Sequence, residues 1–194
     1  TEVPEMFGAE KELLKRCVNE NVFKKAVSMV ESFKEYFVSH NQVVYENPSP
    51  GNKDGGITTL EEKSSGCITK GGNSAVTDVL ALYEECKTDG LSLLWGPGND
   101  IVSTTNLACA GATLILFTTG RGTPLGAPVP TLKISTNSEL YEKKKDWIDF
   151  DAGEVLNGKG FDELSKDLLK KIILIANGEP TKNEINGYEE IAIF

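Results

Sequence analysis

The chain has 194 residues, of which 39% are hydrophobic and 25% charged, as in a globular protein with one large core or two small ones. Its net charge of −9 argues against nonspecific nucleic-acid binding and against an anionic membrane surface, because both partners need a basic face. An anionic small-molecule substrate is compatible with this charge, since a local site can be positive on an acidic protein. No apolar stretch approaches the roughly 20 residues that span a bilayer, and no signal peptide is visible.

The first segment is predicted to be helical. Residues 10–40 carry apolar side chains at spacings of three and four, with charged side chains on the other side. A break near Cys17 precedes a second helix, which Asn19 or Asn21 could cap. The single histidine, His40, lies at the end of that predicted helix. No G-x-S-x-G elbow accompanies it, so we interpret it as a helix-end residue and not as part of a catalytic triad.

Glycine and proline dominate the next segments. Residues 47–56 contain two prolines and three glycines and are predicted to be an irregular loop, either functional or a linker. Thr58 and Thr59 followed by Glu61 and Glu62 predict a capped helix that ends near Gly66. A second glycine-rich segment is expected at 67–74 and a helix at 75–85.

The second half alternates apolar runs with loops. A strand at 91–95, a helix at about 103–110 and a strand at 113–117 predict a β-loop-α-β unit with two parallel strands and a right-handed crossover. The further elements expected are a strand at 131–135, a helical turn at 140–145, an extended piece at 147–151, a helix at 161–177 and an edge strand at 191–194. This order is typical of an α/β fold.

The four cysteines, at positions 17, 67, 86 and 109, form no CxxC pair and no zinc-binding pattern. We expect all four to be buried, reduced thiols in a cytoplasmic protein. The chain starts at a threonine inside what reads as structured sequence, so we expect a fragment or processed piece of a longer protein.

The segment most suggestive of a binding site is Phe117–Pro124, which follows a predicted buried strand. Glycines allow the backbone to approach a ligand, and Arg121 offers a planar set of donors suited to a carboxylate or phosphate. Ligands of open α/β sheets bind where such loops leave the carboxyl ends of strands. The alternative is a tight turn whose arginine packs or pairs with a surface acid.

Three glycine-rich, hydroxyl-bearing loops are candidates for one cleft: 47–56, 96–105 and 118–126. If the predicted strands 91–95 and 113–117 are parallel, the loops 96–105 and 118–126 that follow them lie at the same edge of the sheet. The side chains expected to face that cleft are those of Asp100, Thr104, Thr105, Thr118, Thr119 and Arg121. Asp100 is a candidate metal ligand, or equally an N-cap of the following helix. Lys53 and Lys70 would complete a positive rim, although a lysine in a turn is commonly a surface residue.

Several long motifs occur together. They are Asn47–Lys53 with Gly55–Gly56, Glu62–Lys63, Gly66–Gly72, Gly96–Asp100 with Ser103–Thr105, Phe117–Pro124, Trp147–Gly153 and the opening Thr1–Glu10. With these motifs the chain resembles the altronate/galactarate dehydratase family of sugar-acid lyases over nearly its whole length. Gly66–Cys67 and Trp147–Asp149 favour the altronate branch.

The resemblance implies a fold and an activity. The fold is a Rossmann-like three-layer sandwich, with a mainly parallel sheet flanked by helices. The activity is dehydration of D-altronate to 2-dehydro-3-deoxy-D-gluconate with a divalent metal, iron(II) being expected. The chain corresponds to the C-terminal part of such an enzyme, so an N-terminal β-rich domain and an upstream catalytic segment are missing partners and we expect the chain alone to be inactive. Association of this protein into a homo-oligomer is a further possibility that the sequence leaves open.

Dehydration of a sugar acid requires a carboxylate-binding cation, a base for the α-proton and an acid for the departing hydroxide. The hypothesis is that Arg121 binds the carboxylate and that Asp100 holds a hydroxyl or metal-bound water. Lys70 or Lys53 would be the base or a second anion contact. The substrate-binding set comprises Asn52, Lys53, Thr104, Thr118, Thr119, Arg121 and Thr123, and no metal ligands are assigned. Two alternatives stay open: a lyase of galactarate or of a sulfonated hydroxy acid, and a non-catalytic anion-binding or assembly module.

Overall fold

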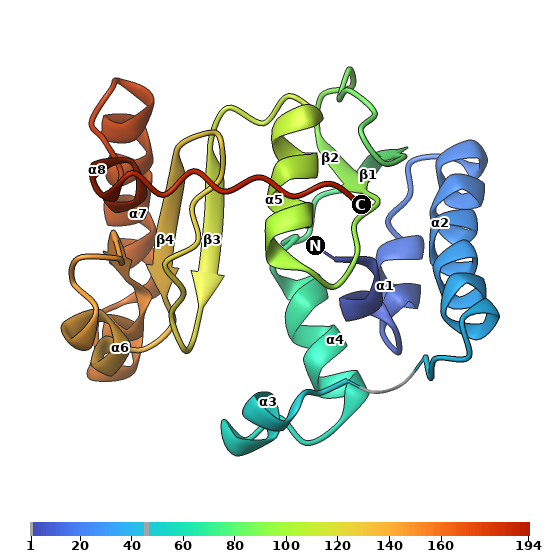
Figure 1. The fold of residues 1–194 in the computed structure, drawn as a ribbon, viewed down its shortest axis with the longest axis horizontal. Helices are drawn as coiled ribbons and strands as arrows, with labels where there is room; N and C mark the ends of the chain where they lie inside the picture. Colours follow the sequence, from blue (N-terminus) through green and yellow to red (C-terminus); the bar gives the residue numbers. More distant parts are fainter. Residues whose placement is uncertain (1, 45–46) are drawn as a thin grey trace. The chain divides into compact units, whose positions relative to one another are not determined.

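The computed structural model describes residues 2–44 and 47–194, and the chain divides into two compact units, Thr1–Ala110 and Gly111–Phe194 (Figure 1). The first unit contains η1 (Val3–Met6), α1 (Glu10–Leu14), α2 (Glu20–Ser39), α3 (Pro50–Asp54), α4 (Leu60–Thr69), β1 (Val76–Leu80), β2 (Leu91–Leu94) and α5 (Asp100–Cys109). The second contains β3 (Ile115–Thr119), β4 (Thr131–Ser135), α6 (Ser138–Lys143), β5 (Phe150–Asp151), η2 (Ala152–Asn157), α7 (Phe161–Ala176) and α8 (Lys182–Asn186). The units are described separately.

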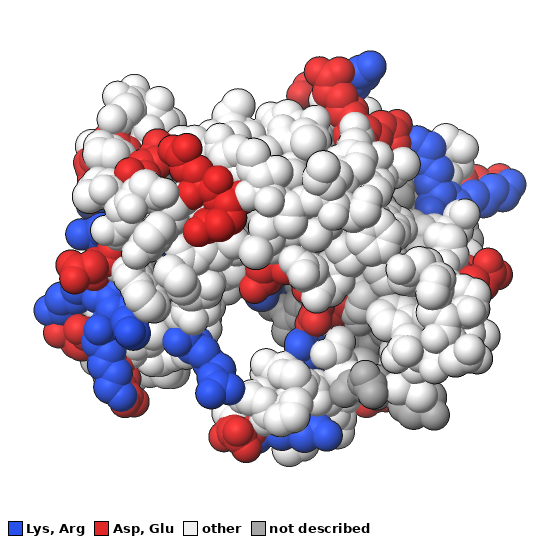
Figure 2. Space-filling view, viewed as in Figure 1, with Lys and Arg blue, Asp and Glu red and all other residues white. Residues whose placement is uncertain are grey.

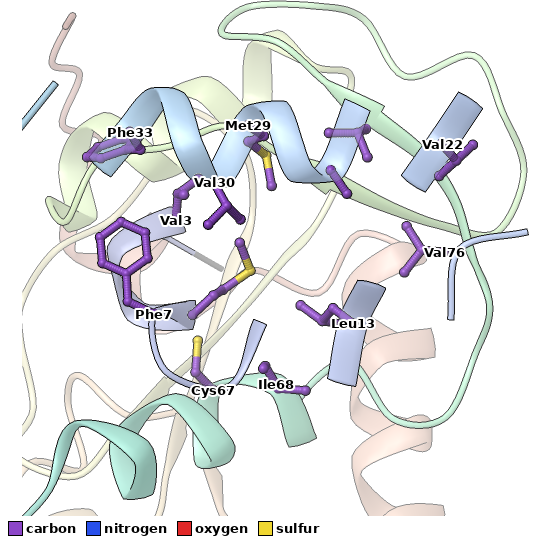
Figure 3. Packing of buried hydrophobic residues seen from close by; sticks show 13 residues of the cluster. Val3, Phe7, Leu13, Val22, Met29, Val30, Phe33, Cys67, Ile68 and Val76 are labelled. Carbon is purple, nitrogen blue, oxygen red and sulfur yellow. The ribbon is translucent and has the colours of Figure 1, made fainter. Parts of the chain in front are cut away.

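The core of the first unit lies among η1, α1, α2, α4 and β1. Figure 3 shows Phe33 and Met29 of α2 on one side of this core and Cys67 of α4 on the other, with Phe7 beside Phe33. The rings of Phe7 and Phe33 meet edge to face, with centroids 6.5 Å apart, which is a favoured arrangement for aromatic pairs. The helical stripe predicted from the sequence is therefore the face by which α2 covers this core.

Polar caps set the helix boundaries. The side-chain oxygen of Asn19 accepts a hydrogen bond from the amide of Val22 at 2.9 Å, so Asn19 is the N-cap of α2, and His40 follows its last residue. Thr59 and Glu62 form the capping box predicted for α4. That helix runs on through Gly66 to Thr69, beyond the predicted end, because Cys67 and Ile68 are buried in the core.

Three predictions of local structure were wrong. Residues 75–85 contain strand β1 and no helix, because buried Val76, Val79 and Leu80 mimic a helical spacing while the strand pairs in parallel with β2. The segment 47–56, predicted to be irregular, contains the one-and-a-half-turn helix α3, which a capping box at Ser49 starts. Residues 191–194, predicted to be an edge strand, form no regular element.

In the second unit β4 is the central strand, paired in parallel with both β3 and β5. Leu132 and Ile134 of β4 pack against α7 through Ile175. The intervening Thr131, Lys133 and Ser135 point to the opposite face, as successive strand residues must, and they are buried as well. The strand is therefore covered on both faces, although its alternating sequence is typical of a strand with one solvated face.

The α/β class with parallel strands flanked by helices is confirmed. The shared sheet edge predicted for the loops 96–105 and 118–126 is wrong. Strand β2 pairs with β1, and β3 belongs to the sheet of β4 and β5. The right-handed β-loop-α-β unit expected across β2, α5 and β3 is thus not formed as one sheet.

Charged side chains are interspersed on the molecular face shown in Figure 2, with wide areas that carry neither sign. In the described ranges, no helix is both long and apolar enough to cross a membrane. Among the described residues no cysteine forms a disulfide, and of the four cysteines Cys67 alone is buried. Cys17 is half-buried, and Cys86 and Cys109 are exposed, so the expectation of four buried thiols was wrong for these residues.

Candidate active site

The segment Gly120–Leu125 of the second unit follows β3 and is fixed on its N-terminal side by two hydrogen bonds. Asn137 Nδ2 donates to the carbonyl of Gly120 at 3.0 Å, and the amide of Gly122 donates to Thr119 Oγ1 at 3.0 Å. Gly122 has a φ of +83°, and a Cβ there would lie 2.9 Å from a Leu140 methyl group. Only glycine fits this turn well, and Arg121 directly precedes it in the chain.

The side chain of Arg121 is exposed in this turn. Among residues 2–44 and 47–194, no carboxylate forms an ion pair with it, so the alternative of pairing with a surface acid is not observed there. Thr118 is exposed and Thr119 half-buried on the strand just before the turn. A fixed backbone that presents an exposed guanidinium is suited to an external carboxylate or phosphate.

Lys133 lies beneath the C-terminal side of the same segment. Its side chain is fully buried, and its ammonium donates to the carbonyls of Thr123 and Leu125 and, at 3.1 Å, to Asn183 Oδ1 of α8. Burial lowers the pKa of Lys133 to about 8, against the opposing charges of Asp149 and Glu190. The substrate-binding role predicted for Thr123 is untested, and its hydroxyl accepts a hydrogen bond from the amide of Leu125.

A second polar cluster lies in the first unit, around the partly buried ion pair of Lys63 with Glu5, whose atoms are 3.1 Å apart. Lys63 Nζ also donates to Asn47 Oδ1 at 3.2 Å and to Asn52 Oδ1 at 2.8 Å. Asn52, predicted to bind substrate, thus uses its oxygen to hold Lys63. The ammonium group of Lys63 thus links Glu5 of η1 to Asn47 and to Asn52 of α3.

Two carboxyl groups near this ion pair have raised pKa values. Burial raises the pKa of Glu2 to about 7, and the negative charges of Asp100 and Glu5 add to the rise while Lys63 opposes it. Desolvation and Glu5 also raise the pKa of Asp100, whereas Lys70 and Lys63 lower it. A carboxyl group that titrates near neutrality can both donate and accept a proton at physiological pH.

The positive charge of Lys70 lowers the pKa of Asp100, so these two predicted catalytic residues lie close enough for their charges to interact. Asp100 is the first residue of α5, and the N-cap is Asn99, so the N-cap alternative for Asp100 was wrong. Lys70 is exposed at the C-cap of α4, and Lys53 is exposed in the last turn of α3. Arg121 belongs to the other unit.

The threonines of α5 are buried, contrary to the expectation that they face a cleft. Thr104 Oγ1 donates to the carbonyl of Asp100 at 2.8 Å, and Thr105 Oγ1 donates to that of Ile101 at 2.8 Å. These are bonds within the helix, four residues back along the chain. The hydroxyl of Thr104 is thereby occupied inside α5.

In the part of the chain that the structure describes, no group of three or more His, Cys, Asp or Glu side chains converges to hold a metal ion. The described residues thus do not form a metal centre by themselves.

Four residues of these clusters were not singled out as site residues from the sequence: Glu2, Glu5, Lys63 and Lys133. Glu2 and Glu5 lie in the motif Thr1–Glu10 and Lys63 in the motif Glu62–Lys63. No spacing rule connects these motifs, since the ion pair of Glu5 with Lys63 joins segments more than 50 residues apart. Lys133 occupies a polar position of an alternating strand, a pattern that predicts exposure.

Comparison with known proteins decides the family. The model of the D-galactarate/altronate dehydratase C-terminal region matches residues 1–194. The chain belongs to the D-galactarate/altronate dehydratase family. It is 58% identical to the altronate dehydratase of Escherichia coli (strain K12) over 194 residues, and 53% identical to that of Bacillus subtilis (strain 168) over 195 residues. Each alignment covers 100% of this chain and 39% of the relative.

A galactarate dehydratase (L-threo-forming) of Escherichia coli (strain K12) is a more distant member of the family. It is 36% identical over 198 residues, which cover 100% of this chain and 38% of that protein. The chain therefore spans less than two fifths of the length of the altronate dehydratases it matches, and the resemblance seen in its motifs is confirmed at the level of the family.

Proposed function

We propose that this chain is the C-terminal part of a hydro-lyase that dehydrates D-altronate to 2-dehydro-3-deoxy-D-gluconate. The observation that supports this is the full-length match at 58% and 53% identity to two altronate dehydratases, against 36% to a galactarate dehydratase. A galactarate-specific enzyme is the alternative. The remaining part of the enzyme is proposed to be a longer N-terminal portion, as in those relatives.

Within this function we assign carboxylate binding to Arg121. The reaction begins at the carbon next to the substrate carboxylate, and negative charge develops on that carboxylate as the α-proton leaves. An exposed guanidinium on a fixed turn, with no carboxylate paired to it among the described residues, is suited to hold this group. Thr118 remains a proposed hydroxyl contact beside it.

The first unit by itself offers a separate candidate for proton transfer, Glu2, whose carboxyl group is partly buried and lies near the charges of Asp100 and Glu5. Dehydration needs a base for the α-proton and an acid for the leaving hydroxide. Glu2, with a pKa of about 7, is populated in both protonation states at neutral pH, and Lys70 near Asp100 supplies positive charge. This candidate rests on burial and charge within the first unit alone. The iron(II) implied by the resemblance stays a prediction.

The test is a chimera in which this chain replaces the matching C-terminal 39% of the Escherichia coli altronate dehydratase. We expect the chimera to release a 2-keto acid from D-altronate and to prefer D-altronate over galactarate. Galactarate turnover without D-altronate turnover would overturn the substrate assignment.

Arg121→Ala in the chimera should lower kcat/KM by on the order of 100-fold, as loss of one charge-stabilising donor does elsewhere. Lys166→Ala, which removes an exposed cation of the same unit, is the matched control and should leave kcat/KM unchanged. Equal activity of the two variants would remove Arg121 from the site.

A further inference from the structure

A buried lysine in a protein core is uncommon, and Lys133 has no role in the proton-transfer or carboxylate-binding assignments above. Its side chain is 0% exposed in the middle of β4. Leu132 and Ile134 on either side face α7, so Lys133 points to the other face of the sheet, toward the segment Thr123–Leu125 and α8. The ammonium group lies over the ring of Phe117, with Nζ 5.9 Å from the ring centroid.

The three donors of the ammonium group match three acceptors. Two are the main-chain carbonyls of Thr123 and Leu125, which flank Pro124, and the third is Asn183 Oδ1. Asn183 is itself held, since its Nδ2 donates to the carbonyl of Thr131 at 3.1 Å. Without Lys133 both carbonyls would lose this donor. The carbonyl of Leu125 is buried and that of Thr123 partly buried, and an unsatisfied buried acceptor is costly.

The same segment is also clamped further along. The amide of Gly126 donates to Glu190 Oε2 at 2.8 Å, and the amide of Glu190 donates to the carbonyl of Gly126 at 3.1 Å. A Cβ at position 126 would overlap the carbonyl oxygen of Tyr188, so the two backbones touch. The segment after Arg121 is therefore fixed from below by Lys133 and from the side by residues 188–190.

We propose that Lys133 is the positioning residue for Arg121: it fixes the Thr123–Leu125 carbonyls and so holds the turn in the orientation that binds the substrate carboxylate. This inference rests on the carboxylate-binding role proposed for Arg121. The N-terminal side of the turn is held by Asn137 and Thr119, and Lys133 supplies the hold on the C-terminal side. A turn fixed on both sides loses little freedom when it binds, which favours affinity.

The first experiment measures the turn itself. In Lys133→Met, a side chain of similar length without donors, we expect amide hydrogen exchange at Arg121, Gly122, Thr123 and Leu125 to become at least about tenfold faster, since the carbonyls that hold this turn lose their partner. The control is Ile134→Met on the same strand, which faces α7 and should leave exchange in the turn unchanged. Unchanged amide exchange in Lys133→Met overturns the inference, whether or not Arg121 binds the substrate carboxylate.

The second experiment is a double-mutant cycle in the chimera. Lys133→Met should raise KM for D-altronate by about 10- to 100-fold and change kcat less, because misplacing a binding group by an ångström has effects of this order. In the Arg121→Ala background the same substitution should change KM less than about threefold, because coupled residues are non-additive. Fully multiplicative effects would show that Lys133 does not act through Arg121.

If Lys133→Met does not fold, Lys133→Arg serves in its place. It keeps the positive charge, but its planar group cannot donate in the three directions of an ammonium. We expect a smaller rise in KM and faster exchange in the turn, and wild-type values of both would overturn the inference. An Arg121→Ala variant with unchanged KM would instead contradict the carboxylate-binding assignment and leave the exchange result on Lys133 standing.

Discussion

Glu2 shows how the surroundings of one residue can change its chemistry. A glutamate ordinarily titrates near 4.5, but in the folded chain the pKa of Glu2 is about 7, first because of burial and then because of Asp100 and Glu5. The carboxylate form is thus disfavoured by folding. Such shifted groups gather at functional sites, which is one reason for placing proton transfer there.

This shift gives Glu2 a pH-dependent effect on stability. Because the folded-state pKa is higher than the unfolded value of 4.5, the folded chain binds more protons between pH 4.5 and 7. The stabilising contribution of Glu2 is present below pH 4.5 and is lost as the pH rises through 7. Glu2→Gln should abolish that loss and raise the free energy of unfolding at pH 8 by roughly 1–3 kcal/mol.

Urea unfolding at a series of pH values measures this effect. Glu12→Gln is the control, because Glu12 is exposed on α1 and should not alter the pH dependence. If Glu2→Gln and wild type lose stability in parallel between pH 5 and 8, the raised pKa of Glu2 is wrong.

At the scale of elements, the boundaries of α2 and α4 follow from their caps. Asn19 and Thr59 each accept a bond from an amide in the first turn, which would otherwise have no partner. These signals are local, so the sequence predicts them well. The strand β1 was missed because its buried valines and leucine also fit a helical spacing, and only its pairing with β2 decides between the two.

The cap of α2 can be tested with a matched pair of substitutions. Asn19→Ala should lower the free energy of unfolding by about 0.5–2 kcal/mol, because the amide of Val22 loses its acceptor. Asn21→Ala, two residues on and inside α2, should be neutral or slightly stabilising, since alanine has the higher helix propensity. Thermal or urea unfolding of the two variants compares them, and equal effects would contradict the assignment of Asn19 as the cap.

At the scale of the whole molecule, the two units have separate cores. The larger hydrophobic cluster runs from Val3 to Val79, and the smaller one joins Leu132, Ile134 and Ile175. No buried residue of one cluster belongs to the other among the described residues. A core substitution should therefore act mainly on its own unit.

Phe33→Ala should destabilise the first unit by about 3–5 kcal/mol and Leu132→Ala the second by about 2–5 kcal/mol, through cavity formation. Phe33 is 2% exposed and Leu132 is 0% exposed. Hydrogen exchange followed by mass spectrometry should show faster exchange confined to residues 1–110 in the first variant and to residues 111–194 in the second. Faster exchange throughout both units in either variant would mean that they unfold together.

The sequence by itself determined the features with a local physical cause: the caps of α2 and α4, the strands β2 and β4, the helix α7 and the glycine turn that carries Arg121. It also carried the long motifs that indicate the sugar-acid dehydratase family. Only the tertiary structure decided that β2 and β3 belong to different sheets, that Lys133 is buried beneath the Arg121 turn, and that Glu2, Glu5 and Lys63 lie together. These features depend on contacts between distant segments, and burial and charge at such contacts have no local signal in the sequence.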